Sequence, residues 1–152
     1  MQVWRLVKTK YARTAFDGEG ARLYGARWNS VGTRAAYAAN SSALAVLEVL
    51  VHLGNVEVLD SYSLIRASLP DALVTTLPSA RLPNGWNRWP APPAVQAVGD
   101  AWVHANESLA LEVPSVIVPG GTNLLINPGH SDFEEFEVEH VQPYRFDARL
   151  VR

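Results

Sequence analysis

The stretch SSALAVLEVLVHLG, residues 41–54, limits the possible folds more than any other part of the sequence. It has the length of a helix and is apolar over most of its circumference, and a helix of that kind is mostly buried. Ser41 or Ser42 can cap its start, and Gly54 can follow its end. We therefore expect a mostly buried helix over about residues 42–53, which the rest of the chain has to cover.

A single polar stripe interrupts this apolar surface. At about 100° per residue, Ser41, Ala45, Glu48 and His52 fall on one side of the helix. The stripe either faces water or lines a pocket, in which the small Ala45 leaves room for a ligand beside Glu48. A carboxylate in a pocket is partly desolvated, which costs free energy unless it is paired or used. Helix periodicity does not distinguish these two interpretations.

The remaining sequence predicts short strands, one further helix and irregular connections in mixed order. Strands are expected at residues 2–7, 33–39, 56–70 with a break near 60–61, 109–120 around Pro114, and 136–151 as a closing strand or hairpin. The second helix is expected at residues 93–106, with Val95, Val98 and Trp102 on one face. Loops are expected at residues 17–32, 78–93 and 122–133. Strands and helices that do not alternate regularly favour an α+β fold.

Length and composition restrict the class of protein. The 152 residues suit one domain covering 1–152, and a net charge of −2 argues against direct nucleic-acid binding. Without cysteine, disulfides, zinc–thiolate sites and cysteine nucleophiles are excluded. The sequence shows neither a signal peptide nor an apolar run long enough to span a bilayer. We expect a soluble cytoplasmic protein that does not contact a membrane.

Three further residues are candidates for chemistry, each with a plainer alternative. Arg27, in the loop YGARWNSVG, can bind a phosphate through two hydrogen bonds, or it can be a surface arginine stacked on Trp28. Tyr37, between alanines, can present its ring for stacking, or it can be a core tyrosine with a satisfied hydroxyl. Ser115 places a hydroxyl in an apolar strand and needs a partner there, but it lacks the sequence context of a hydrolase nucleophile.

Metal and nucleotide motifs are missing from the sequence. His52, His104, His130 and His140 show no metal-binding spacing, and no feature names further ligands beside a Glu48/His52 pair, so we expect no metal. The phosphate-binding glycine fingerprints are also missing.

The order of these candidates resembles the RES domain family, named for an Arg, a Glu and a Ser. The resemblance rests on Arg27 in GARWNSVG, Tyr37 in AAYAA, Glu48 in ALAVLEVLVHLG, Ser115 in VPSVIVP, and NLLINPGHSDF at 123–133. It extends from the first strand to Phe133, whereas residues 55–107 carry no matching motif.

The resemblance implies a fold, a reaction and a partner. The fold is ADP-ribosyltransferase-like, with a split, twisted β-core and flanking helices. The protein would be the toxin of a bacterial toxin–antitoxin pair, with an Xre-type helix-turn-helix antitoxin as partner and NAD⁺ as substrate. Arg27, Tyr37 and Glu48 would be the catalytic residues, and Ser115 and Asn123 would complete the NAD⁺ pocket. The roles of His52, Asn127 and His130 stay open, with turn and loop hydrogen bonding as the plain alternative for the asparagines and His130. The choice between monomer and homodimer also stays open.

The residue types fit cleavage of the nicotinamide–ribose bond. Positive charge develops on the ribose in the transition state, and a fixed carboxylate such as Glu48 stabilises it. Arg27 suits the pyrophosphate, and Tyr37 suits the nicotinamide ring. We therefore expect an NAD⁺ glycohydrolase, with a protein ADP-ribosyltransferase as the alternative within the same chemistry. A non-catalytic ligand-binding or interaction domain is the alternative from another class.

Overall fold

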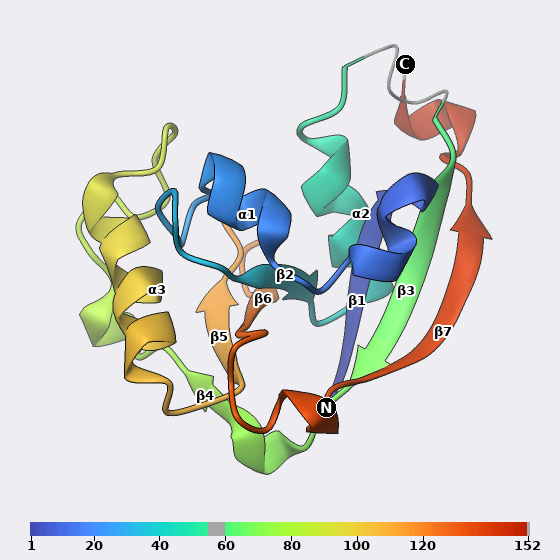
Figure 1. Ribbon diagram of the computed structural model, residues 1–152. Helices are drawn as coiled ribbons and strands as arrows, with labels where there is room; N and C mark the ends of the chain where they lie inside the picture. The colour runs from blue at the N-terminus through green and yellow to red at the C-terminus, as the bar shows by residue number, and fades with distance from the viewer. Residues whose placement is uncertain (55–59, 152) are drawn as a thin grey trace.

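The computed structural model describes residues 1–54 and 60–151. Its strands are β1 Gln2–Lys8, β2 Ala36–Ala39, β3 Tyr62–Ser68, β4 Val74–Thr76, β5 Ala110–Pro114, β6 Thr122–Ile126 and β7 Glu137–Tyr144. Its α-helices are α1 Glu19–Tyr24, α2 Ser42–Leu50 and α3 Pro93–Ala105, and short 3-10 turns connect several elements (Figure 1). Helices and strands follow one another without regular alternation, which confirms the predicted α+β class.

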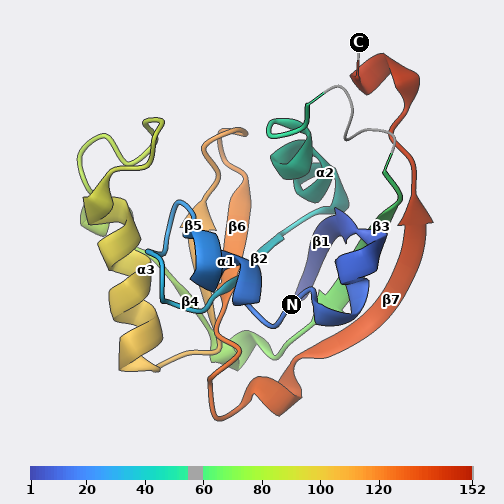
Figure 2. The same cartoon turned by 45° about the horizontal axis from the view of Figure 1, so that its top comes forward.

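The strands form one sheet that is divided in its middle. In the described residues the order is β4-β5-β6-β2-β1-β3-β7, with β4 and β5 parallel and the other neighbours antiparallel. Strands β1 and β3 pair along seven positions, but β1 meets β2 at only one, Trp4 opposite Ala39. Figure 2 shows the result, with β4, β5 and β6 on one side and β1, β3 and β7 on the other. The predicted split β-core is therefore present.

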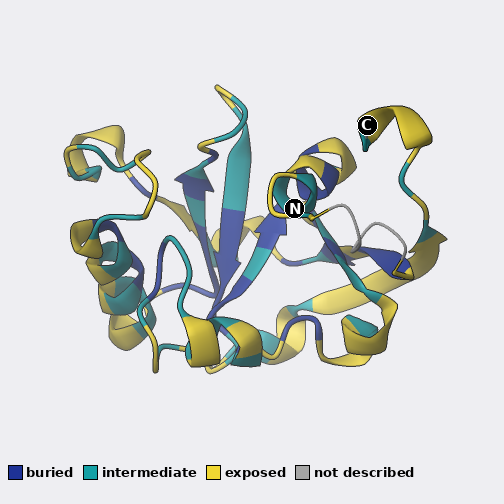
Figure 3. Ribbon diagram, turned by 90° about the horizontal axis from the view of Figure 1, so that it is seen from above, coloured by how far each residue is buried: buried dark blue, intermediate teal, exposed yellow. Residues whose placement is uncertain are grey.

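Each of the two longer helices packs on its own half of the sheet. Leu44 and Ala45 of α2 are buried against Leu6 of β1 and Leu64 of β3. Val95 of α3 is buried in a separate cluster with side chains of β5 and β6, and Val98 and Trp102 pack against it as predicted. Figure 3 shows burial concentrated in the central strands, while the edge strand β7 is exposed along most of its length. The two helices thus cover different halves, while a third cluster, with Val3 and Ile65 on one side and Ala110 and Leu124 on the other, joins the halves.

A glycine in α3 lets this helix approach the chain segment next to Arg27. A Cβ atom on Gly99 would lie 1.7 Å from the carbonyl oxygen of Trp28, far inside van der Waals contact. Only a residue without a side chain fits between the helix and this backbone. The position of the Arg27–Trp28 segment is therefore set by α3.

The helix at residues 42–53 was predicted correctly in place but not in burial. Ser41 caps it by accepting a hydrogen bond from the Leu44 amide at 3.1 Å, as expected. The helix ends at Leu50 with Val51 as C-cap, so the prediction that Gly54 directly follows its end is wrong. The outer side chains Leu47 and Val51 are 36% and 58% exposed, so the helix is covered on one side only.

Two predicted loops contain regular structure. Residues 17–32 include α1, a short helix bounded by Gly18 and Gly25, whose positive φ angles stop it at both ends. Residues 122–133 begin with β6, a central strand paired on both sides with β5 and β2. Its backbone groups are satisfied by those two neighbours, which local turn signals do not reveal. The predicted strand residues 56–59 lie outside the described residues.

The described helices show no membrane-spanning candidate. Within residues 1–54 and 60–151, none combines the length and the apolar composition that crossing a bilayer requires.

Candidate functional site

A large hollow in the described part of the chain lies at the division of the sheet. This central cavity measures about 880 Å³, within the usual range for sites that hold a small molecule. Its walls come from β1, β2, β6, α2, the segment 25–28 and the chain before α3. Arg27, Tyr37, Glu48 and Asn123 all line it. Four candidates predicted from distant parts of the sequence therefore share one cavity.

The polar stripe of α2 faces this cavity. Ala45, Glu48 and His52 all belong to its lining. Ala45 is 4% exposed and keeps the space beside Glu48 free of a larger side chain. Of the two interpretations left open by helix periodicity, the structure selects the pocket.

Two neutral side chains hold the Glu48 carboxylate. Its Oε1 accepts hydrogen bonds from the Ser115 hydroxyl at 3.0 Å and from the Asn123 amide nitrogen at 2.6 Å. The Oε2 atom accepts none from the described residues, so it is available to a ligand. The carboxylate is thus fixed in position, and its charge is not neutralised by a direct ion pair within the described residues.

Ser115 stands behind Glu48 and is buried, with 6% of its surface exposed. Its hydroxyl oxygen also accepts hydrogen bonds from the amides of Ile117 and Val118, at 3.1 and 3.2 Å. One donated and two accepted bonds use the full capacity of a hydroxyl group. Ser115 is not part of the cavity lining, and its hydroxyl orients Glu48. Its role in completing the pocket stays a prediction.

Asn123 contacts Glu48 from β6 and keeps one unused group. Its Oδ1 is buried without a hydrogen-bond partner among the described residues. Buried polar atoms without partners are uncommon in folded proteins, and each asks for an explanation. An acceptor left over beside Glu48 fits a site that receives a ligand donor.

Arg27 combines a structural contact with a charge directed at the cavity. Its Nη1 donates to the carbonyl oxygens of Trp86 and Arg88, at 2.8 and 2.9 Å. Burial lowers the pKa of Arg27 from its ordinary value, and the nearby Glu48 opposes that shift. No carboxylate of the described residues lies within ion-pair distance of it. The guanidinium is therefore not a free surface group, because it bonds loop carbonyls, and no carboxylate of the described residues neutralises it directly.

Tyr37 lines the cavity, and its hydroxyl is already hydrogen-bonded within the protein. The hydroxyl donates to Asn29 Oδ1 at 2.6 Å and accepts from the Trp28 amide at 3.1 Å. Burial raises the pKa of this phenol well above its ordinary value, so it stays protonated at neutral pH. The interpretation of Tyr37 as a tyrosine with a satisfied hydroxyl is confirmed, and the residue also lines the cavity. Stacking of its ring on a ligand stays a prediction.

Arg5 was not predicted from the sequence and is a second buried cation at the division of the sheet. Its Nη1 donates to the main-chain oxygen of Tyr37, and its Nε is buried without a partner among the described residues. Burial lowers the pKa of Arg5 to about 10, with Asp17 opposing the shift. Because β1 and β2 hardly pair, this side chain supplies a hydrogen bond that a neighbouring strand would otherwise give. Only the strand arrangement reveals that role.

Trp89 and His52 stand at the rim of the cavity. Trp89 is 77% exposed, and the ring centroids of the two residues are 6.0 Å apart at an interplanar angle of 49°. His52 comes from the turn that follows α2, and Trp89 from the chain before α3. The sequence predicted a loop at residues 78–93, but not that Trp89 reaches this rim.

Asn127 and His130 lie outside the cavity and serve a turn. The Asn127 side chain bonds Asn106 Oδ1 and the Gly129 amide, and His130 Nδ1 accepts from the Asp132 amide. The plain alternatives of turn and loop hydrogen bonding are therefore correct for these two. For Asn123 the turn alternative is wrong, because this residue belongs to β6. No three His, Asp or Glu side chains gather closely enough to hold a metal ion in the part of the chain that the structure describes.

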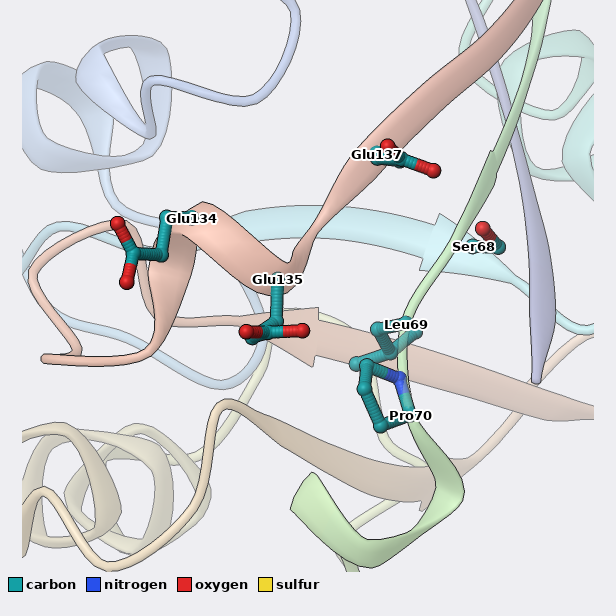
Figure 4. Close-up of a pocket in the computed structure, with 6 residues that line it drawn as sticks. All are labelled: Ser68, Leu69, Pro70, Glu134, Glu135 and Glu137. Carbon is teal, nitrogen blue, oxygen red and sulfur yellow. The ribbon is translucent and has the colours of Figure 1, made fainter.

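A second, smaller hollow differs in chemical character. It measures about 320 Å³, and Figure 4 shows its lining of Glu134, Glu135 and Glu137 beside the segment 68–70. Three carboxylates without a basic or aromatic side chain in the lining repel an anionic ligand such as a dinucleotide. The central cavity is therefore the candidate site.

Comparison with known proteins identifies the family of the chain. The model of the RES domain family matches residues 2–148. The protein named Toxin Res of Photorhabdus laumondii subsp. laumondii is 38% identical over 154 residues, covering 100% of this chain and 98% of the relative. The Prs ADP-ribosylating toxin of Sphingobium sp. is also 38% identical, covering 98% of this chain and 96% of its own length.

A solved structure supports the fold. The chain matches one in the crystal structure of the M. tuberculosis MbcT-MbcA toxin-antitoxin complex with a TM-score of 0.76, at 24% sequence identity. The match covers 95% of this chain and 84% of that one, which supports the expected RES-type fold. Family model, full-length relatives and fold agree, and the chain belongs to the RES domain family.

Proposed function

We propose that the protein is a toxin that cleaves the nicotinamide–ribose bond of NAD⁺. One observation carries the proposal: Glu48, fixed by Ser115 and Asn123, shares a cavity with Arg27 and the Tyr37 ring. A carboxylate, a cation and an aromatic face are the groups that a ribosyl cation, a diphosphate and a nicotinamide ring require. The names of the full-length relatives support the toxin part.

In this proposal the electron pair of the scissile C–N bond leaves with nicotinamide. The ribosyl carbon becomes positively charged, and Glu48 stabilises that charge while its free Oε2 accepts a hydrogen bond from a ribose hydroxyl. Water then adds to the ribosyl carbon and loses a proton, which gives ADP-ribose. Arg27 binds the diphosphate through the nitrogens that its contact with the loop leaves free. Tyr37 supports the nicotinamide ring, and Asn123 accepts a hydrogen bond through Oδ1.

Transfer of ADP-ribose to a protein is the second candidate. It uses the same ribosyl cation and replaces water by a nucleophile of the acceptor. The name of the Sphingobium relative, an ADP-ribosylating toxin, favours this alternative specifically.

The experiment is a mass balance on NAD⁺ with purified protein, alone and with bacterial lysate proteins. We expect nicotinamide and ADP-ribose in equal amounts, and a loss of activity of about a hundredfold to a thousandfold in Glu48→Gln, in line with removal of a preorganised electrostatic group. A protein adduct in place of free ADP-ribose selects the transferase. Unchanged NAD⁺ with and without acceptors would leave the non-catalytic binding domain as the better explanation.

The biological setting is part of the same proposal. A helix-turn-helix antitoxin of the Xre type is the proposed partner, supported by the toxin–antitoxin complex that contains the similar fold. The cytoplasm, where NAD⁺ is available, is the proposed compartment. We treat residues 1–152 as one domain, and the homodimer stays a prediction.

A further inference from the structure

The rim of the central cavity carries an exposed aromatic residue that the mechanism above does not use. Trp89 is 77% exposed and lines the cavity together with His52. The two rings come from different elements and are 6.0 Å apart. Sites for small molecules are lined mainly by apolar and aromatic side chains, so an exposed tryptophan at the mouth of this cavity suits a binding role.

The protein holds Trp89 in this exposed position through its neighbours. Arg27 Nη1 binds the carbonyl oxygens of Trp86 and Arg88, so the residue next to Trp89 is anchored to the cavity wall. Trp86, three residues earlier, is turned inward and stacks on Trp28 with centroids 6.2 Å apart. One tryptophan of the segment thus supports it from inside, and the other faces the rim.

The positions of the charged and aromatic groups follow the order of groups in a dinucleotide. Glu48 occupies the place proposed for the reacting ribose. Arg27, close enough to Glu48 for their charges to interact, occupies the place proposed for the diphosphate. Arg27 donates a hydrogen bond to the carbonyl oxygen of Arg88, the residue that precedes Trp89. His52 lies four residues after Glu48, in the turn that follows α2.

We propose that Trp89 and His52 form a clamp that stacks on the purine base of the dinucleotide. The inference rests on the proposed function, since NAD⁺ supplies the base. Ring atoms in van der Waals contact are about 3.5 Å apart, so a base between two rings needs them about 7 Å apart. The present 6.0 Å separation and 49° tilt require a small opening, which two rim side chains can provide by rotation.

The test measures binding without cleavage. Calorimetric titration compares ADP-ribose, which has the base, with ribose 5-phosphate, which has a phosphate and no base. For Trp89→Ala we expect affinity for ADP-ribose to fall roughly tenfold, the effect of losing one aromatic partner of a base, with affinity for ribose 5-phosphate unchanged. Trp89→Phe should keep most of the affinity, and His52→Ala should lose less than Trp89→Ala because its ring is smaller.

Tyr24→Ala is the matched control. Tyr24 is 83% exposed and lies outside the lining of the cavity, so its removal should change neither affinity. Circular dichroism establishes that each variant is folded before it is titrated.

The outcomes separate this inference from the proposed function. Equal affinity of wild type and Trp89→Ala for ADP-ribose overturns the clamp, even if NAD⁺ is cleaved normally. An equal loss for both ligands also overturns it, because the defect would then not concern the base. Tenfold selective loss supports the clamp even if no cleavage of NAD⁺ is found, in which case only the enzyme proposal fails.

Discussion

At the scale of single residues, the site depends on how Glu48 is held. Ser115 and Asn123 donate to it as neutral groups, whereas Arg27 directs two donor bonds at loop carbonyls. An arginine bonded directly to the carboxylate would offset its charge, and neutral donors fix its position while leaving the charge effective. The geometry therefore separates positioning of the carboxylate from neutralisation of its charge.

Ser115→Ala tests this separation. The variant removes one of the two donors to Glu48 and leaves the side chains that line the cavity in place. We therefore expect kcat to fall roughly tenfold to a hundredfold with KM little changed. The size corresponds to a hydrogen bond to a charged group, about 1.5–3 kcal/mol. Steady-state nicotinamide release measures both constants.

The matched control is Ser108→Ala. Ser108 is also a buried serine, but it bonds Thr75, Trp102 and the Ala110 carbonyl and not Glu48. It should reduce the free energy of unfolding without changing kcat per folded molecule. A normal kcat in Ser115→Ala would contradict the positioning role.

At the scale of elements, close packing between α3 and the Arg27–Trp28 segment fixes one wall of the cavity. Gly99 is the point of closest approach. In an ordinary helix, replacing glycine by alanine stabilises by about 0.5–1 kcal/mol. At Gly99 the added Cβ would collide with a backbone carbonyl, so the same replacement should destabilise the protein.

We expect Gly99→Ala to reduce the free energy of unfolding by about 1–3 kcal/mol, the usual range for overpacking. Urea denaturation followed by circular dichroism measures it. Gly20→Ala in α1 is the control, because nothing lies within 4 Å of a Cβ there, and it should be neutral or slightly stabilising. Equal effects of both substitutions would show that the contact at Gly99 relaxes at little cost.

The contrast between predicted and observed elements has a physical origin. The helix starting after Ser41 and the strand Gln2–Lys8 follow from local patterns, capping and alternation, and were predicted. Strand β6 was missed because its structure depends on its pairing with β5 and β2, and β2 is distant from it in the sequence. Trp89 and Arg5 were missed as site residues for the same reason, since only tertiary structure brings them to the cavity. The five candidates Arg27, Tyr37, Glu48, Ser115 and Asn123 were found through their order along the chain.

At the scale of the whole molecule, the two hollows described above differ in the charged side chains that line them. The central cavity contains arginines and aromatic rings, and the smaller one contains three glutamates. If the central cavity is the source of toxicity, substitutions in the two should have different effects in cells.

Induced expression in a bacterium should therefore arrest growth and lower cellular NAD⁺ for the wild-type protein and for Glu135→Ala. Glu48→Ala and Arg27→Ala should be tolerated, because one removes the carboxylate and the other the diphosphate contact and the anchor of the loop. Growth curves and an enzymatic NAD⁺ assay provide the readout, with protein levels matched by immunoblot. Toxicity of Glu48→Ala at matched expression would locate the harmful activity elsewhere.

The strand order also has a consequence for protein synthesis. Glu48, Arg27 and Tyr37 belong to the first third of the chain, but the donors that fix Glu48 arrive with Ser115 and Asn123. Strand β6, which carries Asn123, must insert between β2 and β5 before the cavity is complete. A nascent chain on the ribosome thus carries the Glu48 carboxylate without the groups that orient it. The cell that makes this protein is exposed to an assembled site only after most of the polypeptide has emerged.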